Sequence, residues 1–324
     1  MLPEPHVATV VLNYRGIDDT VACVRALMGS TVLDQRIIVV DNEAPGPEHD
    51  ALRAAVPERV EVVATGGNLG YAAGNNVGIR MAMQRRPEYV WLVNPDLRVE
   101  PETLEGLLAT AHAIKDAGVI GPRIVHGGTT PSKIWFDGGI FDRAKDGATS
   151  HLHDGRLEAD VPVTGPRDVG YVTGACMLVR ADVVRTVGTI PEDYFLYFEE
   201  TDYCQRVKAA GWRLLADPRA RAVHHKRSSG DLPTVAYVYY MRRNKELFAR
   251  AMGLDTARVV AQFEKVWVDP WRANITRRAP GWVETFDALI AQAAADAAAG
   301  RGGRRDDLDR FASAEAFRLT TAEA

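Results

Sequence analysis

Short apolar runs alternate with helical patterns through the first half of the chain, and this alternation limits the possible folds more than any other feature. The apolar runs are rich in β-branched residues and predict strands at Val7–Leu12, Arg36–Val40, Val60–Ala64 and Tyr89–Val93. Each run precedes a helical pattern, at Asp18–Met28, Glu48–Ala55, Tyr71–Met83 and Pro101–Lys115. Continuous apolar strands alternating with helices predict an α/β fold, with a parallel sheet covered by helices on both faces.

The second half is less regular. Residues 127–169 are rich in Gly, Asp and Pro and predict an irregular excursion with a hairpin. Regular structure is expected again at Tyr171–Arg180, at a helix ending near Ala210, and at a strand starting at Arg213. Beyond Leu254 the chain becomes helical and Ala-rich, so we expect one domain over residues 1–253 and a C-terminal helical extension over residues 254–324.

Composition excludes several classes of protein. The chain has 324 residues, of which 46% are hydrophobic, enough for a sizeable core, and its net charge of −4 gives no reason to expect nucleic-acid binding. Cys23, Cys176 and Cys204 lack zinc-like or disulfide-framework spacing. We find no signal-peptide pattern and no run of about 18 apolar residues, so a cytoplasmic protein without a transmembrane helix is expected.

Polar or glycine-rich segments follow all four predicted strands. They are Asn13–Tyr14, Asp41–Asn42, Gly66–Gly70 and Asn94–Asp96. In a parallel sheet the carboxyl ends of the strands meet at one edge, where ligands bind. The glycine loop opens a helix, and a helix amino terminus attracts anions. It is not the dinucleotide-binding fingerprint, which would follow the first strand.

Asp96 is a candidate cation ligand. A carboxylate at a strand end can bind Mg²⁺ or Mn²⁺, which need only one or two protein carboxylates when phosphates and water supply the other ligands. The alternative is a turn aspartate, because Asn-Pro and Pro-Asp are common turn formers. Taken alone, turn chemistry explains these residue types without a ligand.

An acidic segment, Glu199, Glu200 and Asp202, begins the helix predicted to end near Ala210. Acidic residues in a first turn interact favourably with the helix dipole, which would explain them without a function. The aromatic residues just before them favour a second interpretation. A carboxylate with partly apolar surroundings has a raised proton affinity, which suits a general base.

His224 and His225 end an apolar strand and precede Lys226 and Arg227. Neutral imidazole binds metals, and a basic loop can hold phosphate oxygens. A structural or solvent-facing histidine pair is the alternative, and for a lone feature it is the commoner one.

These residues together resemble glycosyltransferase family 2, which has the GT-A fold, and in particular its rhamnosyltransferase-like and galactofuranosyltransferase-like branch. The resemblance covers roughly residues 7–252, and its matching stretches occur in the family's order: VVLNYRG, IIVVDN, GGNLGYAAGNNVGI, WLVNPD, WFDGG, VTGACMLVR, FLYFEETDYCQRVKAAGW and VHHKRSSG. It implies a Rossmann-like, mixed and mostly parallel sheet that binds a nucleotide-sugar.

The resemblance also implies a role for each matching residue. Nucleotide binding is expected from Asn13, Asp41, Asn68, Asn94, Asp96, Lys226 and Arg227. Asp96 and His224, or His225 in its place, would hold the Mg²⁺ or Mn²⁺, and Glu200 would be the general base. Glu199 and Asp202 would shape the acceptor site, which Trp135 and Asp137 would line. The family's DxD signature is reduced here to Asn94-Pro95-Asp96, and its base is more commonly Asp, which leaves the choice among the acidic residues open.

The implied reaction is inverting transfer of a sugar to an acceptor hydroxyl. By resemblance the donor is dTDP-rhamnose or a UDP-sugar, and the acceptor is a glycan, a lipid-linked precursor or a secondary metabolite, as in cell-wall or polysaccharide biosynthesis. A noncatalytic nucleotide-sugar or glycan-binding protein and a sugar nucleotidyltransferase are the alternatives. In the extension, Trp267, Trp271 and Trp282 lie among arginines, which suggests packing, a homodimer contact or peripheral contact with the inner membrane face.

Overall fold

The computed structural model describes residues 6–225 and 232–312. The strands are β1 (Val7–Asn13), β2 (Gln35–Asp41), β3 (Glu61–Ala64), β4 (Tyr89–Val93), β5 (Leu97–Val99), β6 (Ala117–His126), β7 (Ile134–Phe136), β8 (Gly139–Asp142), β9 (Ala148–His151), β10 (Arg167–Asp168), β11 (Cys176–Arg180) and β12 (Arg213–His224). The helices are α1 (Ile17–Met28), α2 (Pro47–Ala55), α3 (Gly70–Met83), α4 (Thr103–Ala113), α5 (Ala181–Val187), α6 (Glu199–Ala209), α7 (Val235–Ala251), α8 (Thr256–Phe263), α9 (Asp269–Arg278) and α10 (Val283–Ala298).

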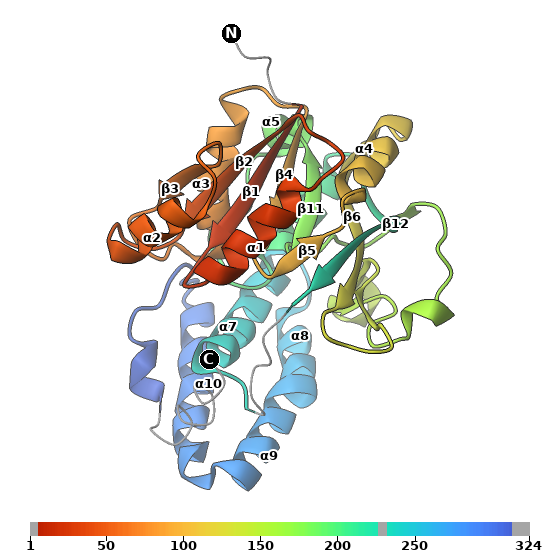
Figure 1. Cartoon of the computed structure of the whole chain (residues 1–324). Helices are drawn as coiled ribbons and strands as arrows, with labels where there is room; N and C mark the ends of the chain where they lie inside the picture. Colours follow the sequence, from red (N-terminus) through yellow and green to blue (C-terminus); the bar gives the residue numbers. More distant parts are fainter. Residues whose placement is uncertain (1–5, 226–231, 313–324) are drawn as a thin grey trace. The chain divides into compact units, whose positions relative to one another are not determined.

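One mixed sheet contains most of the strands (Figure 1). Its order is β10-β12-β6-β11-β4-β1-β2-β3, with β5 paired to β12 and β7 paired to β6. The pairs β1–β2, β1–β4, β2–β3 and β12–β6 are parallel, whereas β11 is antiparallel to both of its neighbours. The direction of strand addition reverses between β3 and β4, so the carboxyl ends of β1, β2 and β4 lie next to one another at a topological switch point.

The α/β fold class predicted from the sequence is confirmed, and the first four predicted strands and helices match observed ones closely. The sequence pattern did not predict β6, because this strand contains two glycines and a proline, which normally interrupt strands. Neighbouring side chains fill the space beside those glycines. A Cβ on Gly121 would lie 2.6 Å from Val172 Cγ1, and one on Gly118 would lie 2.7 Å from Trp212 Cβ.

Helix α3 packs unusually close to the sheet. A Cβ on Gly74 would lie 2.6 Å from Leu12 Cδ1 and 3.3 Å from Asn42 Cγ, so a larger residue would push the helix away from β1. This close packing holds the start of α3, and the glycine loop before it, against the ends of β1 and β2.

The chain forms two compact units. Within the described residues, the first comprises residues 6–141, 149–191 and 203–225 and contains the large sheet, and the second comprises residues 142–148, 192–202 and 232–312. The second unit has its own aromatic core, in which Trp282 is 1% exposed and donates from Nε1 to the carbonyl of Phe311 at 2.8 Å. The domain boundary predicted after residue 253 stays a prediction.

The predicted C-terminal helices are present, from α8 to α10, with a π-helical turn (Glu264–Val268) between α8 and α9. No helix in the described ranges combines the length and the apolar character needed to cross a bilayer.

Candidate functional site

Asn13 and Asp41 lie side by side at the ends of β1 and β2, where the parallel register pairs them. Asn13 Nδ2 donates to Asp41 Oδ1 at 2.9 Å, and Asp41 Oδ2 lies 2.8 Å from His49 Nδ1. Asn13 Oδ1 accepts from the hydroxyl of Thr20 at 2.8 Å, which fixes the orientation of the amide. The Asp41 carboxylate is therefore held in one orientation, and each of its oxygens keeps a further acceptor position.

The glycine loop after β3 is organised by Asn42. Its Oδ1 accepts from the backbone N–H of Leu69 at 3.0 Å, and its Nδ2 donates to Asn68 Oδ1 and to the carbonyl of Gly70, both at 3.2 Å. Asn68 Oδ1 also accepts from the N–H of Gly70 at 2.9 Å. These bonds bring Asn68 to the same edge as Asp41, as the sequence predicts, and they identify Asn42 as the residue that shapes the loop.

Asp96 and His224 are brought together by the pairing of two short segments of strand. β5 follows Asp96 directly, and its antiparallel register with β12 sets Leu97 opposite His224. Asp96 Oδ2 consequently lies 2.9 Å from His224 Nε2, although 128 residues separate the two in the sequence. Asn94 precedes them in a turn closed by the N–H of Leu97 donating to the Asn94 carbonyl at 3.1 Å.

The environment of this pair fits a divalent cation. Asp96 Oδ1, on the carboxylate that faces His224, is buried and has no hydrogen-bond partner, which is costly unless another group satisfies it. His224 Nδ1 is also buried without a partner, but it lies on another side of the ring from Nε2 and would not contact the same ion. Two ligands bound side by side to one ion at about 2.1 Å stand about 3 Å apart, close to the observed separation of Asp96 and His224. Oxygen and imidazole nitrogen are also a suitable donor set for Mn²⁺ or Mg²⁺.

Between the two candidate histidines, the geometry favours His224. Its side chain is 7% exposed and lies edge-on to the Trp135 ring, with 4.3 Å between the ring centroids. His225 is exposed and bonds to Asp96 through its backbone N–H, at 2.8 Å. Trp135 therefore contacts the Asp96–His224 pair directly. Lys226 and Arg227, predicted to hold phosphate, lie outside the described residues.

Asp137 occupies a different environment from the one expected of an acceptor contact. Its carboxylate is completely buried, accepts from Arg123 Nε and Nη2, both at 3.1 Å, and lies 2.7 Å from His153 Nδ1. Arg167 Nη2 forms an ion pair with the carboxylate at 2.5 Å and donates to the main-chain carbonyl of Asp137. Burial acts to raise the pKa of the Asp137 carboxyl, but these donors and cations outweigh it and hold that pKa below its ordinary value. We therefore assign Asp137 to the scaffold beneath Trp135 rather than to substrate contact.

The acidic segment belongs to the second unit and begins α6. Burial, the larger cause, and the charge of Glu200 raise the pKa of Glu199 well above its ordinary value, and burial raises the pKa of Glu200. One carboxylate oxygen of each is buried without a partner. Glu199 is 4% exposed whereas Glu200 is half-buried, so Glu200 is the more accessible of the two. Asp202 is 1% exposed and accepts from the hydroxyl of Tyr194 at 2.8 Å, a structural contact.

A strained aromatic segment precedes these carboxylates. Phe195, Tyr197 and Phe198 have φ angles of 66°, 73° and 76°, in the left-handed region that bulky residues rarely adopt. The buried amide of Asn244 holds this segment by donating to the carbonyls of Tyr194, Leu196 and Tyr197 at 2.9, 2.7 and 3.2 Å.

Sequence reasoning missed Asn244, as it missed Asn42 as an organiser of the glycine loop and His49 as a partner of Asp41. Asn244 is a polar residue inside a helical pattern, and only its position in α7 shows that it faces the backbone of a distant loop. His49 is easier to anticipate, because it lies near the start of the first helix predicted after Asp41, Glu48–Ala55.

The switch point with polar strand ends and the antiparallel β11 define a GT-A fold. A solved structure supports this assignment of the fold: GalNAc-T7 with UDP, GalNAc and Mn²⁺ aligns with a TM-score of 0.55 at 15% identity, over 86% of this chain and 59% of that chain.

The sequence model of glycosyl transferase family 2 matches residues 7–188, more than half of the chain. The chain therefore belongs to glycosyl transferase family 2, and the predicted family is confirmed. An N-acetylglucosaminyl-diphospho-decaprenol L-rhamnosyltransferase of Mycobacterium tuberculosis is 30% identical over 213 residues, which are 60% of this chain and 67% of that protein. The low-salt glycan biosynthesis hexosyltransferase Agl10 of Haloferax volcanii is 26% identical over 207 residues. That match covers 61% of this chain, and the chain spans 60% of the length of Agl10.

Proposed function

We propose that this chain is an inverting glycosyltransferase that transfers a sugar from a pyrimidine nucleoside diphosphate to a hydroxyl of its acceptor. The observation that carries the proposal is the 2.9 Å approach of Asp96 to His224 at the carboxyl edge of the sheet. The unpartnered buried Oδ1 of Asp96, and the oriented carboxylate of Asp41 at the same switch point, support it.

On this proposal Asp96 and His224 hold Mg²⁺ or Mn²⁺. When bound, such an ion neutralises the negative charge that builds on the departing diphosphate. The nucleotide base donates a hydrogen bond to Asp41, which Asn13 and His49 orient. Asn68 and Asn94 would contact the nucleotide on either side of these residues.

Glu200 removes the proton of the acceptor hydroxyl. Its raised pKa makes it a stronger base than an ordinary glutamate, and its partial exposure leaves it accessible to an acceptor. Attack on the anomeric carbon from the face opposite the diphosphate inverts that centre, and the rate gain comes from holding the two reactants in line. Glu199 is the alternative base, and Trp135 lines the acceptor site.

For the donor sugar we propose rhamnose carried on dTDP, with a UDP-sugar as the second choice. The similarity to the L-rhamnosyltransferase of Mycobacterium tuberculosis supports rhamnose as the donor sugar, and the diphospho-decaprenol acceptor in that enzyme's name supports a lipid-linked acceptor. A lipid-linked acceptor would agree with peripheral membrane contact through the C-terminal helices, where Trp267 is 42% exposed. A homodimer through the same helices stays a prediction as well.

The central test compares donor binding with transfer in matched variants of the full chain. Glu200→Gln should bind UDP or dTDP with Mn²⁺ as wild type does and lose transfer by about 1000-fold or more, since general base catalysis typically contributes about 10²–10⁴. Glu58→Gln, an exposed carboxylate outside the site, is the control and should retain full activity.

Asp96→Asn should instead weaken donor binding and abolish its dependence on Mn²⁺. Unchanged turnover in Glu200→Gln would remove that residue from the mechanism, and full activity of wild type in a chelator would remove the cation. Donor binding without transfer to any acceptor would favour a noncatalytic binding protein.

A further inference from the structure

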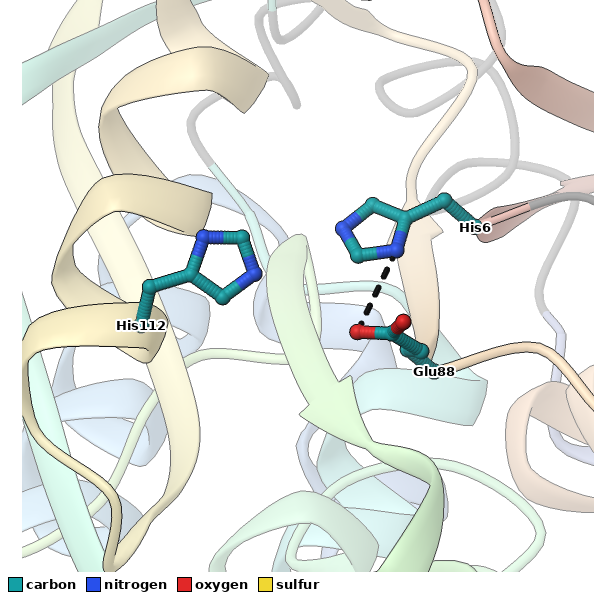
Figure 2. Close-up of side chains that lie close together, drawn as sticks. All are labelled: His6, Glu88 and His112. Atoms are coloured by element: carbon teal, nitrogen blue, oxygen red, sulfur yellow. Dashed lines mark ion pairs between the residues drawn. The ribbon is translucent and has the colours of Figure 1, made fainter.

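Two histidines and a glutamate gather at the edge of the sheet opposite the candidate site. His6 precedes β1, Glu88 precedes β4, and His112 lies in the last turn of α4. One ligand atom from each lies within 4.8 Å of the other two, and in the described part of the chain no other group of three or more His, Cys, Asp or Glu residues meets this spacing. Figure 2 shows the three side chains, with the His112 ring directed from α4 toward His6 and Glu88.

Backbone hydrogen bonds fix two of these residues side by side. The carbonyl of His6 accepts from the N–H groups of Glu88 and Tyr89, at 3.1 and 3.2 Å, at the point where β1 and β4 begin to pair. His6 Nδ1 and Glu88 Oε2 then lie 3.2 Å apart. Tetrahedral ligands at about 2.0–2.1 Å from a metal stand about 3.3 Å apart, so this pair already has the spacing of two ligands.

The third residue is held in reach by Arg180 and Tyr89. Arg180 Nη2 donates to the carbonyl of Ala111 at 2.7 Å, which ties the end of α4 to the end of β11. The buried Tyr89 ring lies edge-on to both imidazoles, with centroid distances of 5.5 Å to His6 and 6.0 Å to His112. Glu88 and His112 are exposed, so a change of rotamer can bring their ligand atoms closer without moving the backbone.

We propose that His6, Glu88 and His112 form a binding site for a divalent transition metal such as Zn²⁺. Two imidazoles and one carboxylate are a ligand set that suits Zn²⁺, with water in the fourth position, whereas Mg²⁺ prefers oxygen ligands. The site joins the start of β1 to the end of α4, so bound metal stabilises the fold. This inference is independent of the proposed function, because it concerns the amino ends of the strands.

The test is a Zn²⁺ titration of the chelator-treated full chain by calorimetry, with the melting temperature measured in parallel. Asp96→Asn serves as the background, so that the candidate site at the other edge does not contribute. In this background we expect one equivalent of Zn²⁺ to bind and to raise the melting temperature. Adding His112→Ala should weaken binding by about tenfold or more, which corresponds to about 1.4 kcal/mol.

His126→Ala is the matched control, because His126 is a partly exposed histidine outside the cluster. It should bind Zn²⁺ as the background does. Equal affinity in His112→Ala and the background would overturn the proposal, as would absence of binding in the background. If His112→Ala lowers the metal-free melting temperature, Glu88→Gln is measured in its place, with the same expected loss of affinity and the same overturning result.

Discussion

Buried carboxylates in this chain differ in whether cations surround them. Asp137 has two arginines and a histidine around it, and Asp217 bonds to Arg219, so the pKa of each lies below its ordinary value despite burial. Glu199 is buried and Glu200 half-buried, each has one buried oxygen without a partner, and their pKa values are raised. The first group stabilises the fold, whereas the second keeps a high proton affinity at a cost in stability.

The raised pKa of Glu200 predicts the pH dependence of transfer. The deprotonated form is the active base, so transfer should fall as pH decreases through the raised pKa, at higher pH than the ordinary glutamate value of about 4.3. Measuring kcat/KM against pH gives the acidic limb. A constant rate down to about pH 4.5 would contradict the prediction. Glu199→Gln should retain the limb if Glu200 is the base and should abolish transfer if Glu199 is.

The raised pKa of Glu200 has the opposite effect on the stability of the fold: stability falls with rising pH, whereas transfer rises. The folded chain binds the Glu200 proton more tightly than the unfolded chain, so between the unfolded and folded pKa values the free energy of unfolding decreases as pH rises.

Asp137→Asn should destabilise the protein without changing what it binds. The substitution leaves Arg123, which is 1% exposed, as a buried cation with a weaker partner, and breaking a buried pair in this way costs about 3–5 kcal/mol. Urea denaturation measures the loss. Asp168→Asn removes a surface pair with Arg213 and should cost at most about 1 kcal/mol. A stable Asp137→Asn variant with weakened acceptor binding would return Asp137 to the acceptor site.

At the scale of elements, the segment between residues 194 and 198 illustrates how a helix can support a loop distant in sequence. Left-handed backbone at a bulky residue costs about 1–3 kcal/mol, and three such residues occur within four positions. The amide of Asn244, in α7, satisfies three carbonyls of this segment at once. Helical structure was expected only beyond Leu254, so α7 was not predicted, and a buried amide in a helix has no sequence signature of its own.

Asn244→Ala should loosen this segment selectively. The carbonyls of Leu196 and Tyr197 lose a donor, and that of Tyr194 keeps Arg243 Nη2 at 2.8 Å. We therefore expect the free energy of unfolding to fall by about 1–3 kcal/mol and hydrogen exchange at residues 194–198 to become faster. Asn274→Ala, in α9, is the control and should change stability by about 0.5 kcal/mol or less. Unchanged exchange in Asn244→Ala would show that other contacts hold the segment.

For the whole molecule, some of the contacts that form the candidate site can be predicted from the sequence and others cannot. The strand ends carrying Asn13, Asp41 and Asp96 were predictable, because apolar strand patterns and right-handed crossovers fix where parallel strands end. The approach of Asp96 to His224 rests on β5, a strand of three residues that is too short to show periodicity. The ion pairs of Asp137 could not be predicted for a related reason, since its partners Arg123 and Arg167 lie on two different strands.

The preference for a pyrimidine nucleotide depends on all the residues at the carboxyl ends of the strands together. In thermal-shift measurements with Mn²⁺, UDP or dTDP should raise the melting temperature more than GDP, because Asp41 accepts from a pyrimidine base, and the shift should shrink without Mn²⁺. Asp41→Ala should reduce the difference among the nucleotides. Equal shifts for all three in wild type would contradict the assigned role of Asp41.

The separation of 128 positions between Asp96 and His224 in the sequence also has a consequence for biosynthesis. β12 takes its place between β10 and β6 only after nearly all of the sheet has been translated. A nascent chain that stops short of residue 224 therefore exposes the edge of β6 and leaves Asp96 without its partner, so such fragments should be inactive and prone to capture by chaperones.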